Sequence, residues 1–397
     1  MRTVWHFKKP TKTSRACPIT TVARGPEPPV VIVGPTHPYT GGIAQHTTRL
    51  AQELEARSVT VRVESWKAQY PKRLYPGPDR VPGNEPEVGV ASDVTEKLAW
   101  YNPLSWWSAG SRARSARHLV LTVPTPFHAV PYLVLLVASG RKAERIAMVH
   151  NVLPHEPGPL DKLLMRRLLK AVDRAIVHGD RAKDTAVGLG VRQEAITVRS
   201  LPSPWPQQAS SPSSAARKGP IRLIFFGTIR HYKGLDILLQ ALSRVPDLEL
   251  LVAGEFWDDR ALYDALVSSL GLSARVTIRP GYVAEADFAD VFGEADLAVL
   301  PYRSGTGSIV RELAFSHGLP VLATDVGAIA EGIVPGKNGD VVPAGDEEAL
   351  VKALEKASSR STIRTWQKNV ASQPGKNASQ WESYCEAILG NSREERQ

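Results

Sequence analysis

Hydrophobic residues along the chain recur in two alternating patterns. Short apolar runs of strand length are separated by stretches in which apolar residues return every three or four positions, as on one face of a helix. The runs form two series: PVVIVG, VTVRVES, HLVLTVP, RIAMVH, RAIVHG and AITVRS, and then IRLIFFG, LELLVAG, RVTIRPG, DLAVLPY, LPVLATD and DVVPA. Strands that alternate with helices build parallel sheets, so the pattern predicts an α/β protein with two doubly wound, Rossmann-like domains.

The boundary between the two series lies in a segment rich in proline, serine and alanine, which is typical of a linker. We predict a basic, loosely packed extension over 1–28, a first domain over 29–205, a linker over 206–220, a second domain over 221–375, and over 376–397 a helix that returns to the first domain, followed by a polar tail. Ligands of open α/β sheets bind beyond the carboxyl ends of the strands, so the two domains should face each other across a cleft.

Composition and charge narrow the class of protein. Of 397 residues, 43% are hydrophobic and 22% charged, which is typical of a globular protein. The net charge of +9 is uneven: residues 1–210 carry 29 Lys and Arg against 16 Asp and Glu (+13), and residues 211–397 carry 20 against 24 (−4). A basic first half favours an anionic partner, such as a phosphorylated ligand or a membrane surface, although a solvated basic face explains it equally.

Cysteine content and apolar run length bear on the cellular location. Two cysteines, Cys17 and Cys385, make no disulfide framework and lack metal-ligand spacing. The N-terminal segment has no apolar run of signal-peptide length, and the run AVPYLVLLVA is too short to span a bilayer. We therefore expect a cytoplasmic protein, with peripheral contact at the inner face of the membrane left open.

One basic amphipathic pattern, LDKLLMRRLLKAVDR, bears on membrane contact. Its apolar face is Leu160, Leu164, Leu168 and Val172, and its flanking cations are Lys162, Arg166, Arg167, Lys170 and Arg174. Such a helix can lie on an anionic membrane. A core-facing helix with a solvated basic side is the favoured interpretation.

Two strand ends carry residues that suit an anionic ligand. Gly41 and Gly42 precede a helix, where glycine lets backbone N–H groups approach an anion, although a tight turn alone also explains them. Arg230 and Lys233 follow the strand IFFG, and two cations there can neutralise a diphosphate, with an exposed basic loop as the alternative.

The stretch LPYRSGTGSIVREL is a third strand end of this kind. Its small residues Ser304, Gly305, Thr306, Gly307 and Ser308 allow N–H groups to converge on a ligand. Glu312 follows Ser308 by four residues and shares its helical face, so the carboxylate can accept hydrogen bonds from ribose hydroxyls. A carboxylate that is simply favoured by the helix dipole is the alternative.

A fourth strand, RIAMVH, ends in His150, which should point into the cleft, and His155 and Glu156 follow closely. A purely structural role is the alternative for either histidine. On the acceptor side, the candidates are Tyr39, Trp66, Tyr70 and Arg73, the last three from the basic and aromatic loop Ser65–Gly77.

These residues together resemble a known family. The ordered set is Gly-Gly before the first helix, HNxxPHE, FFGxIRxYKG, AGE, GYV, LPYRSGTGS, REL and GLPVLATDVGAIAEGI. It resembles the retaining glycosyltransferases of family 4, also described as glycosyl transferases group 1, which have the GT-B fold. The resemblance covers most of residues 30–390, and it implies transfer of a sugar from a nucleotide diphosphate sugar with retention of anomeric configuration.

Site roles follow from the resemblance, residue by residue. It implies that Arg230 and Lys233 contact the diphosphate, Glu312 the ribose, and Tyr282 and Val283 the base, while His150 lies near the sugar. The full donor-binding set is Gly41, Gly42, Arg230, Lys233, Gly254, Tyr282, Val283, Ser304, Gly305, Thr306, Gly307, Ser308 and Glu312, and the catalytic set is His150, Arg230 and Lys233. No cofactor is implied beyond the nucleotide sugar, and the acceptor is a sugar, a lipid-linked molecule or another small molecule, not a nucleic acid.

Two departures from the family pattern concern the donor. Ser304 stands eight positions before Glu312, where many members have a Glu that contacts the sugar. Thr228 follows Gly227, where many members have an Arg, and the arginine here is Arg230. We expect no metal ion, because no strand end carries a DxD-like acidic pair and Asp258-Asp259 reads as a helix start.

Other functions stay open at this stage. A nucleotide-sugar epimerase, a phosphorylase or an inactive homologue would share the fold and the cleft. A nucleic-acid-binding protein would use the basic first half, although no nucleic-acid-binding motif is recognisable.

Overall fold

The computed structural model describes residues 28–71, 80–81, 93–154, 158–205, 219–305, 308–372 and 376–390. Several predictions therefore lie outside the described residues. They are the extension over 1–27, the linker over 206–218, the tail over 391–397, and the single residues Arg73, His155, Glu156, Thr306 and Gly307.

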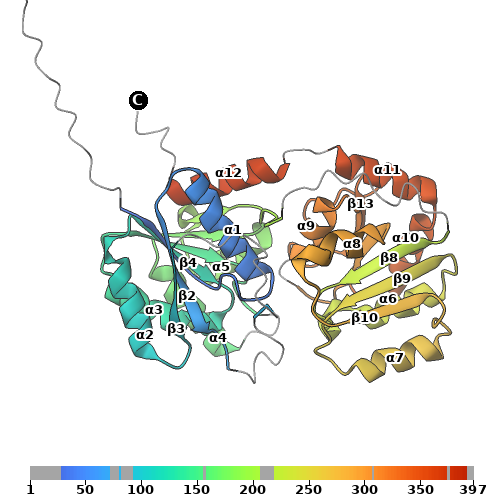
Figure 1. Cartoon of the computed structure of the whole chain (residues 1–397), viewed down its shortest axis with the longest axis horizontal. Helices are drawn as coiled ribbons and strands as arrows, with labels where there is room; N and C mark the ends of the chain where they lie inside the picture. The colour runs from blue at the N-terminus through green and yellow to red at the C-terminus, as the bar shows by residue number, and fades with distance from the viewer. Residues whose placement is uncertain are drawn as a thin grey trace, which may run out of the picture.

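The first domain lies at the left in Figure 1. It is built on a seven-stranded parallel sheet in the order β3-β2-β1-β4-β5-β6-β7. Its strands are β1 (Val30–Val33), β2 (Val61–Ala68), β3 (Val94–Ala99), β4 (His118–Val123), β5 (Glu144–Val149), β6 (Arg174–Val177) and β7 (Ile196–Val198). Its helices are α1 (Gly42–Ala56), α2 (Pro103–Arg112), η1 (Ala113–Ser115), η2 (Pro126–His128), α3 (Ala129–Ser139), α4 (Pro159–Lys170), α5 (Asp180–Gly188) and η3 (Gln193–Ala195). The central strands are buried on both faces, which is why their sequences read as continuous apolar runs.

The second domain repeats the plan with six parallel strands in the order β10-β9-β8-β11-β12-β13. Its strands are β8 (Ile221–Phe226), β9 (Leu248–Gly254), β10 (Val276–Pro280), β11 (Leu297–Leu300), β12 (Val321–Thr324) and β13 (Gly339–Val342). Its helices are η5 (His231–Lys233), α6 (Leu235–Ser243), α7 (Arg260–Ser269), η6 (Glu285–Asp287), α8 (Phe288–Gly293), α9 (Ile309–Ser316), α10 (Glu347–Ala357) and α11 (Arg360–Ala371). Helices α6, α7, α10 and α11 cover one face of the sheet, and α8 and α9 cover the other.

The last helix, α12 (Lys376–Leu389), lies on the first domain although it follows the second in sequence (Figure 1). Its residues Trp381, Tyr384 and Ile388 complete a core cluster with strand β1 and helix α1. Arg174 of β6 donates to the carbonyl of Ala387 at 2.5 Å. Conversely, Trp205, at the end of the first domain, packs into the core of the second.

The buried side of helix α4 differs from the apolar face expected from the sequence. Leu168 is buried and Leu164 is half-buried, but Leu160 at the start of the helix is exposed, and Arg174 belongs to strand β6 and not to the helix. In the described part of the chain, no helix combines the length and the apolar composition needed to cross a bilayer.

Candidate active site

Two helices from different domains meet end to end at the cleft. Helix α1 begins after Gly41, which has a φ of 95° and supplies no side-chain cap, so the first N–H groups of the helix stay open. Helix α9 begins after Ser308, whose hydroxyl accepts from the Val310 N–H at 3.3 Å. A Cβ added at Gly42 would lie 2.7 Å from the Ile309 side chain, so Gly42 allows the close approach. Because helix N-termini carry partial positive charge, this junction attracts an anion.

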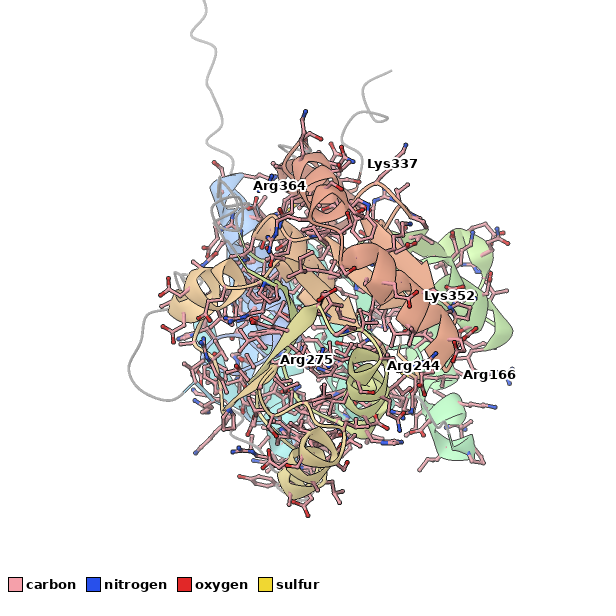
Figure 2. The ribbon with its side chains drawn as sticks, turned by 90° about the vertical axis from the view of Figure 1, so that its right-hand side faces the viewer. Arg166, Arg244, Arg275, Lys337, Lys352 and Arg364 are labelled. Atoms are coloured by element: carbon pink, nitrogen blue, oxygen red, sulfur yellow. The ribbon has the colours of Figure 1, made fainter. Side chains whose placement is uncertain are left out.

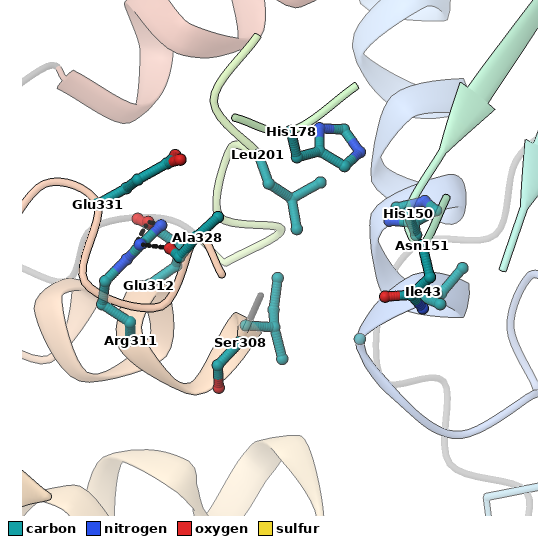
Figure 3. A pocket seen from close by; sticks show the side chains of 12 residues that line it. Ile43, His150, Asn151, His178, Leu201, Ser308, Arg311, Glu312, Ala328 and Glu331 are labelled. Carbon is teal, nitrogen blue, oxygen red and sulfur yellow. Dashed lines mark hydrogen bonds and ion pairs between the residues drawn. The ribbon is translucent and has the colours of Figure 1, made fainter. Parts of the chain in front are cut away.

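Two adjoining cavities open at this junction, and both are lined by Gly42, Ser308 and Ile309. The lysine cavity, of about 300 Å³, takes its name from Lys233; its lining also includes Gly41, Gly254, Tyr282, Val283 and Leu313. The histidine cavity, of about 180 Å³, is lined among others by His150, Asn151, His178, Arg311, Glu312 and Glu331 (Figure 3).

Lys233 is a buried cation at the lysine cavity. Its side chain is 8% exposed, and its Nζ lies 5.6 Å from the centre of the Tyr302 ring. No acidic side chain of the described residues forms an ion pair with it. Burial, together with the nearby positive charge of Arg230, lowers the pKa of Lys233 to about 8. A buried ammonium without a counter-ion is unfavourable by itself, so the site is arranged to receive an anion.

Glycines at the ends of β8 and β9 shape the wall beside Lys233. Gly254 has a φ of 148°, and a Cβ there would lie 2.0 Å from the Gly227 carbonyl oxygen. A Cβ at Gly227 would lie 3.4 Å from Lys233 Nζ. Side chains at these positions would therefore fill the space next to the ammonium.

Arg230 is not brought into the lining of either cavity. Its guanidinium lies over the rings of Trp257, at 4.9 Å, and Tyr232, at 5.6 Å. Ile229, the residue before it, is buried and bridges to Phe256, so the loop directs Arg230 outward. Ser304 and Gly305 also lie outside both linings; a Cβ at Gly305 would meet Ile329 at 2.5 Å, so this glycine serves packing.

Glu312 lines the histidine cavity, whereas Tyr282 and Val283 line the adjoining lysine cavity. Successive residues of a helix point about 100° apart. At this turn of α9, Leu313 is the residue that lines the lysine cavity.

Arg311 fixes the Glu312 carboxylate. Arg311 is 7% exposed, and its guanidinium donates to Glu312 Oε1 through Nε at 2.9 Å and through a terminal nitrogen at 2.5 Å. It also donates to the carbonyl oxygens of Ala328, at 2.6 Å, and Ile329. One arginine thus holds both Glu312 and the segment that leads to Glu331 (Figure 3).

Glu331 reaches across the cleft from the second domain. A Cβ at Gly179, in the first domain, would lie 2.2 Å from Glu331 Oε1, and only the absence of a side chain there admits the carboxylate. Burial raises the pKa of Glu331, with Asp180 adding to the effect and Arg311 opposing it. The Arg181–Asp325 ion pair, at 3.0 Å, joins the domains nearby.

Three histidines form a buried cluster behind the histidine cavity. The ring centre of His150 lies 5.4 Å from that of His46 and 5.0 Å from that of His178. Two aromatic rings of α12 cover the cluster: Trp381 stacks on His46 at 5.0 Å and Tyr384 on His178 at 5.9 Å. Burial lowers the pKa of all three imidazoles, that of His178 to about 4, so the cluster is neutral at physiological pH.

The hydrogen bonds of the cluster define the tautomer of His178. Its Nδ1 lies 3.2 Å from the Arg199 carbonyl oxygen, so Nδ1 carries the proton and Nε2 is left as an acceptor. Within the described part of the chain, His150 Nε2 and both ring nitrogens of His46 have no hydrogen-bond partner. His150 also lines the histidine cavity, although this Nε2 atom is itself buried.

The cluster predicts acid sensitivity of the fold. The folded-state pKa values lie below the ordinary value of 6.5, so the full stability exists above that pH and is lost as the pH falls toward about 4. His46→Leu removes one such group without breaking a hydrogen bond, and thermal unfolding between pH 7 and pH 4 should show a smaller loss than in the wild type. The exposed His231→Leu is the control; equal acid sensitivity in the wild type and His46→Leu would contradict the prediction.

Several lining residues of the site were not expected from the sequence: Asn151, His178, Arg311 and Glu331. His178 had a usable signal, because it ends strand RAIVHG as His150 ends RIAMVH. Arg311 and Glu331 stand within the motifs REL and GLPVLATDVGAIAEGI, but only the tertiary structure brings the two side chains to one cavity.

None of the three described acceptor-side candidates lines either cavity. Trp66 is fully buried among residues of α2 and α3, 5.3 Å from the His128 ring, and Tyr39 is buried beneath Arg80. Tyr70 is half-buried against Phe127 and His128. Among the described residues, no group of three or more His, Cys, Asp or Glu is placed to hold a metal ion.

A sequence comparison assigns the second domain. The profile described as "Glycosyl transferases group 1" matches residues 220–360. This segment is a glycosyl transferases group 1 domain. The resemblance seen in the motifs is thereby confirmed, and Lys233, Gly254, Ser308 and Glu312 all lie within the group 1 domain.

Curated relatives match over part of the chain. The D-inositol 3-phosphate glycosyltransferase of Rhodococcus erythropolis is 31% identical over 202 residues, which are 48% of this chain and 45% of that protein. The protein of the same name from Mycobacterium tuberculosis is 35% identical over 122 residues, 30% of this chain and 25% of that one. The chain thus matches less than half the length of each.

Solved structures match over nearly the whole chain. Anabaena HepE, solved in complex with UDP and glucose, aligns over 91% of this chain and 99% of its own with a TM-score of 0.72 and 16% identity. Sucrose-phosphate synthase from Thermosynechococcus elongatus aligns over 92% and 98% with a TM-score of 0.70 and 17% identity. The predicted GT-B fold, with the group 1 domain facing a second Rossmann-like domain, is confirmed.

Proposed function

We propose that the protein transfers a sugar from a nucleotide diphosphate sugar to an acceptor hydroxyl, with retention of anomeric configuration. The observation that carries the proposal is the buried Lys233 ammonium, which has no ion-pair partner among the described residues, beside two converging helix N-termini in the interdomain cleft. A diphosphate supplies the missing negative charge. The group 1 domain and the relatives named above support the same reaction class.

The nucleotide occupies the lysine cavity in this proposal, with Tyr282 and Val283 beside the base. The diphosphate lies at the junction of the two cavities, where it meets Lys233 and the N–H groups of α1 and α9. Cleavage of the sugar–phosphate bond builds negative charge on the leaving phosphate, and fixed positive groups stabilise that charge best when they are already in place. Arg230, held on Trp257, adds to the positive field without touching the ligand.

The transferred sugar and the acceptor hydroxyl occupy the histidine cavity. Glu312 and Glu331 accept hydrogen bonds from sugar hydroxyls on one side, and His150 engages the sugar from the other (Figure 3). His150 is neutral, so it orients a hydroxyl and does not act as a charged acid. Ser304 lies outside the lining of this cavity, so Glu312 and Glu331 supply the carboxylates that contact the sugar in its place.

A ligand panel tests the proposal. Thermal unfolding is measured with UDP, GDP, ADP and dTDP and with the corresponding sugars, because a ligand at about 100 times its Kd stabilises the folded state by about 2.7 kcal/mol. We expect stabilisation by one nucleotide family, and a product whose anomeric proton, followed by NMR, keeps the donor configuration. An absence of stabilisation by every member would overturn the assignment.

A further inference from the structure

Exposed apolar side chains are concentrated on one side of the first domain. Of the ten large hydrophobic side chains that are exposed in the described part of the chain, seven lie on or beside helices α2, α3 and α4. These three helices pack next to one another on the same face of the sheet, opposite α1 and α12. The second domain contributes two of the other three, in separate places.

Helix α3 lacks a polar face. Its sequence AVPYLVLLVAS packs Tyr132, Leu135 and Leu136 into the core, while Val130 and Val137 point outward and are exposed. A helix that is apolar all round is ordinarily covered by another layer. Here no described element covers the outer side of α3, so the structure leaves an apolar face open.

The neighbouring helices extend this face. On α2, Leu104 is 80% exposed, and Trp107, three residues later on the same side, is also exposed. On α4, Leu160 and Leu163 are exposed in the same way. We call the outer sides of the three helices, with these residues, Val130 and Val137, the α2–α4 surface.

Positive charge surrounds the α2–α4 surface. Among the described residues between 100 and 174, eight Lys and Arg side chains are exposed, against a single exposed acidic side chain, Asp173. Arg141 and Lys142 follow the end of α3, and Arg166 and Arg167 lie on α4. Arg166 lies at the right-hand margin of the molecule in Figure 2.

The surface continues toward the site. Helices α2, α3 and α4 each follow a strand of a parallel sheet, so all three begin at the edge where those strands end. Leu104, Val130 and Leu160 lie in the first turns of these helices, and His150 ends β5 at the same edge. An apolar layer in contact with the surface would therefore border the mouth of the histidine cavity.

We propose that the α2–α4 surface binds an anionic lipid bilayer. Scattered leucine, valine and tryptophan side chains enter the interfacial region of a bilayer, while the long Lys and Arg side chains around them reach anionic headgroups. A second copy of the chain fits less well, because a symmetric contact would bring two strongly basic surfaces together. The inference goes beyond the transfer reaction and does not depend on it.

Vesicle co-sedimentation without any donor tests the proposal. The full chain should bind phosphatidylcholine vesicles that contain phosphatidylglycerol at least about tenfold more tightly than pure phosphatidylcholine vesicles, and added salt should weaken this binding. The double variant Leu104→Ser/Trp107→Ser and the charge variant Arg166→Glu/Arg167→Glu should each lose about tenfold in affinity or more. Leu262→Ser is the matched control, since Leu262 is 67% exposed on α7 of the other domain.

Thermal unfolding verifies that each variant is folded, and Leu160→Ser/Leu163→Ser repeats the test on a different helix should the α2 variant not fold. The proposal is overturned if the wild type does not sediment with the anionic vesicles, or if both apolar variants bind as the wild type does. It is also overturned if ultracentrifugation shows a dimer that these variants separate, because a second copy then covers the surface.

Discussion

Lys233→Met is expected to lower turnover of the nucleotide sugar by about 100- to 1,000-fold, since removal of one fixed donor to a developing anion costs about 2.7 to 4 kcal/mol. The variant should also lose most of its affinity for the free nucleotide diphosphate, measured by calorimetry. Methionine keeps the length of the side chain and removes only the charge. Lys352→Met, on the exposed side of α10 and labelled in Figure 2, should behave as the wild type.

Lys233→Met should also change the stability of the unliganded protein. The pKa of Lys233 falls from 10.5 to about 8 on folding, so this group disfavours the folded state at neutral pH, and the cost disappears as the pH rises from about 8 toward 10.5. Unliganded Lys233→Met should therefore unfold at the wild-type temperature or above it. Diphosphate affinity should decline above about pH 8 in the wild type and stay flat in the variant. Lower stability together with undiminished diphosphate binding would show that Lys233 has a structural role.

Glu312→Gln is expected to affect transfer of the sugar much more than binding of the free nucleotide diphosphate. Glu312 lines the histidine cavity, so its loss should reduce kcat/KM for the nucleotide sugar by about 10- to 150-fold, the range for a hydrogen bond to a charged group. Affinity for the free nucleotide diphosphate should change by less than about threefold, because that ligand occupies the lysine cavity.

The outcome discriminates between two roles of this carboxylate. A ribose contact, as the family resemblance implies, would weaken the nucleoside diphosphate and the nucleotide sugar equally. Glu331→Gln provides the parallel case: its carboxylate lies in the same cavity, and no arginine of the described residues forms an ion pair with it. If Glu312→Gln lowers the affinity for both ligands equally, Glu312 contacts the ribose.

Most of the fold could be predicted because its signals are local. The strands of the second domain were evident as apolar runs, most clearly β8, β9, β11 and β12, because strands covered by helices on both faces need little polar sequence. Strand β3 was missed: two of the six residues of its sequence VTEKLA are charged, because it forms the edge of the sheet and pairs with β2 alone. Its existence depends on a partner that local sequence does not reveal.

The site was predicted less completely, for reasons of direction and distance. Trp66 was expected near the acceptor, yet side chains alternate along a strand, and residues 62, 64 and 66 of β2 all face α2. Glu312 was correctly placed on α9. Which cavity it lines depends on its direction around the helix, because the next residue, Leu313, lines the other cavity. The position of Glu331 at the cavity could not be inferred, because it depends on Gly179 of the other domain.

Because of helix α12, the core of the first domain is completed by the last helix to be synthesised. The first domain begins to be synthesised before the second, yet Trp381, Tyr384 and Ile388 close its core and cover the histidine cluster only after the whole of the second domain has been made. Until then, the part of the first sheet that α12 covers beside α1 stays exposed on a growing chain. The two domains therefore do not mature as independent units: loss of the last helix would damage the domain at the opposite end of the sequence.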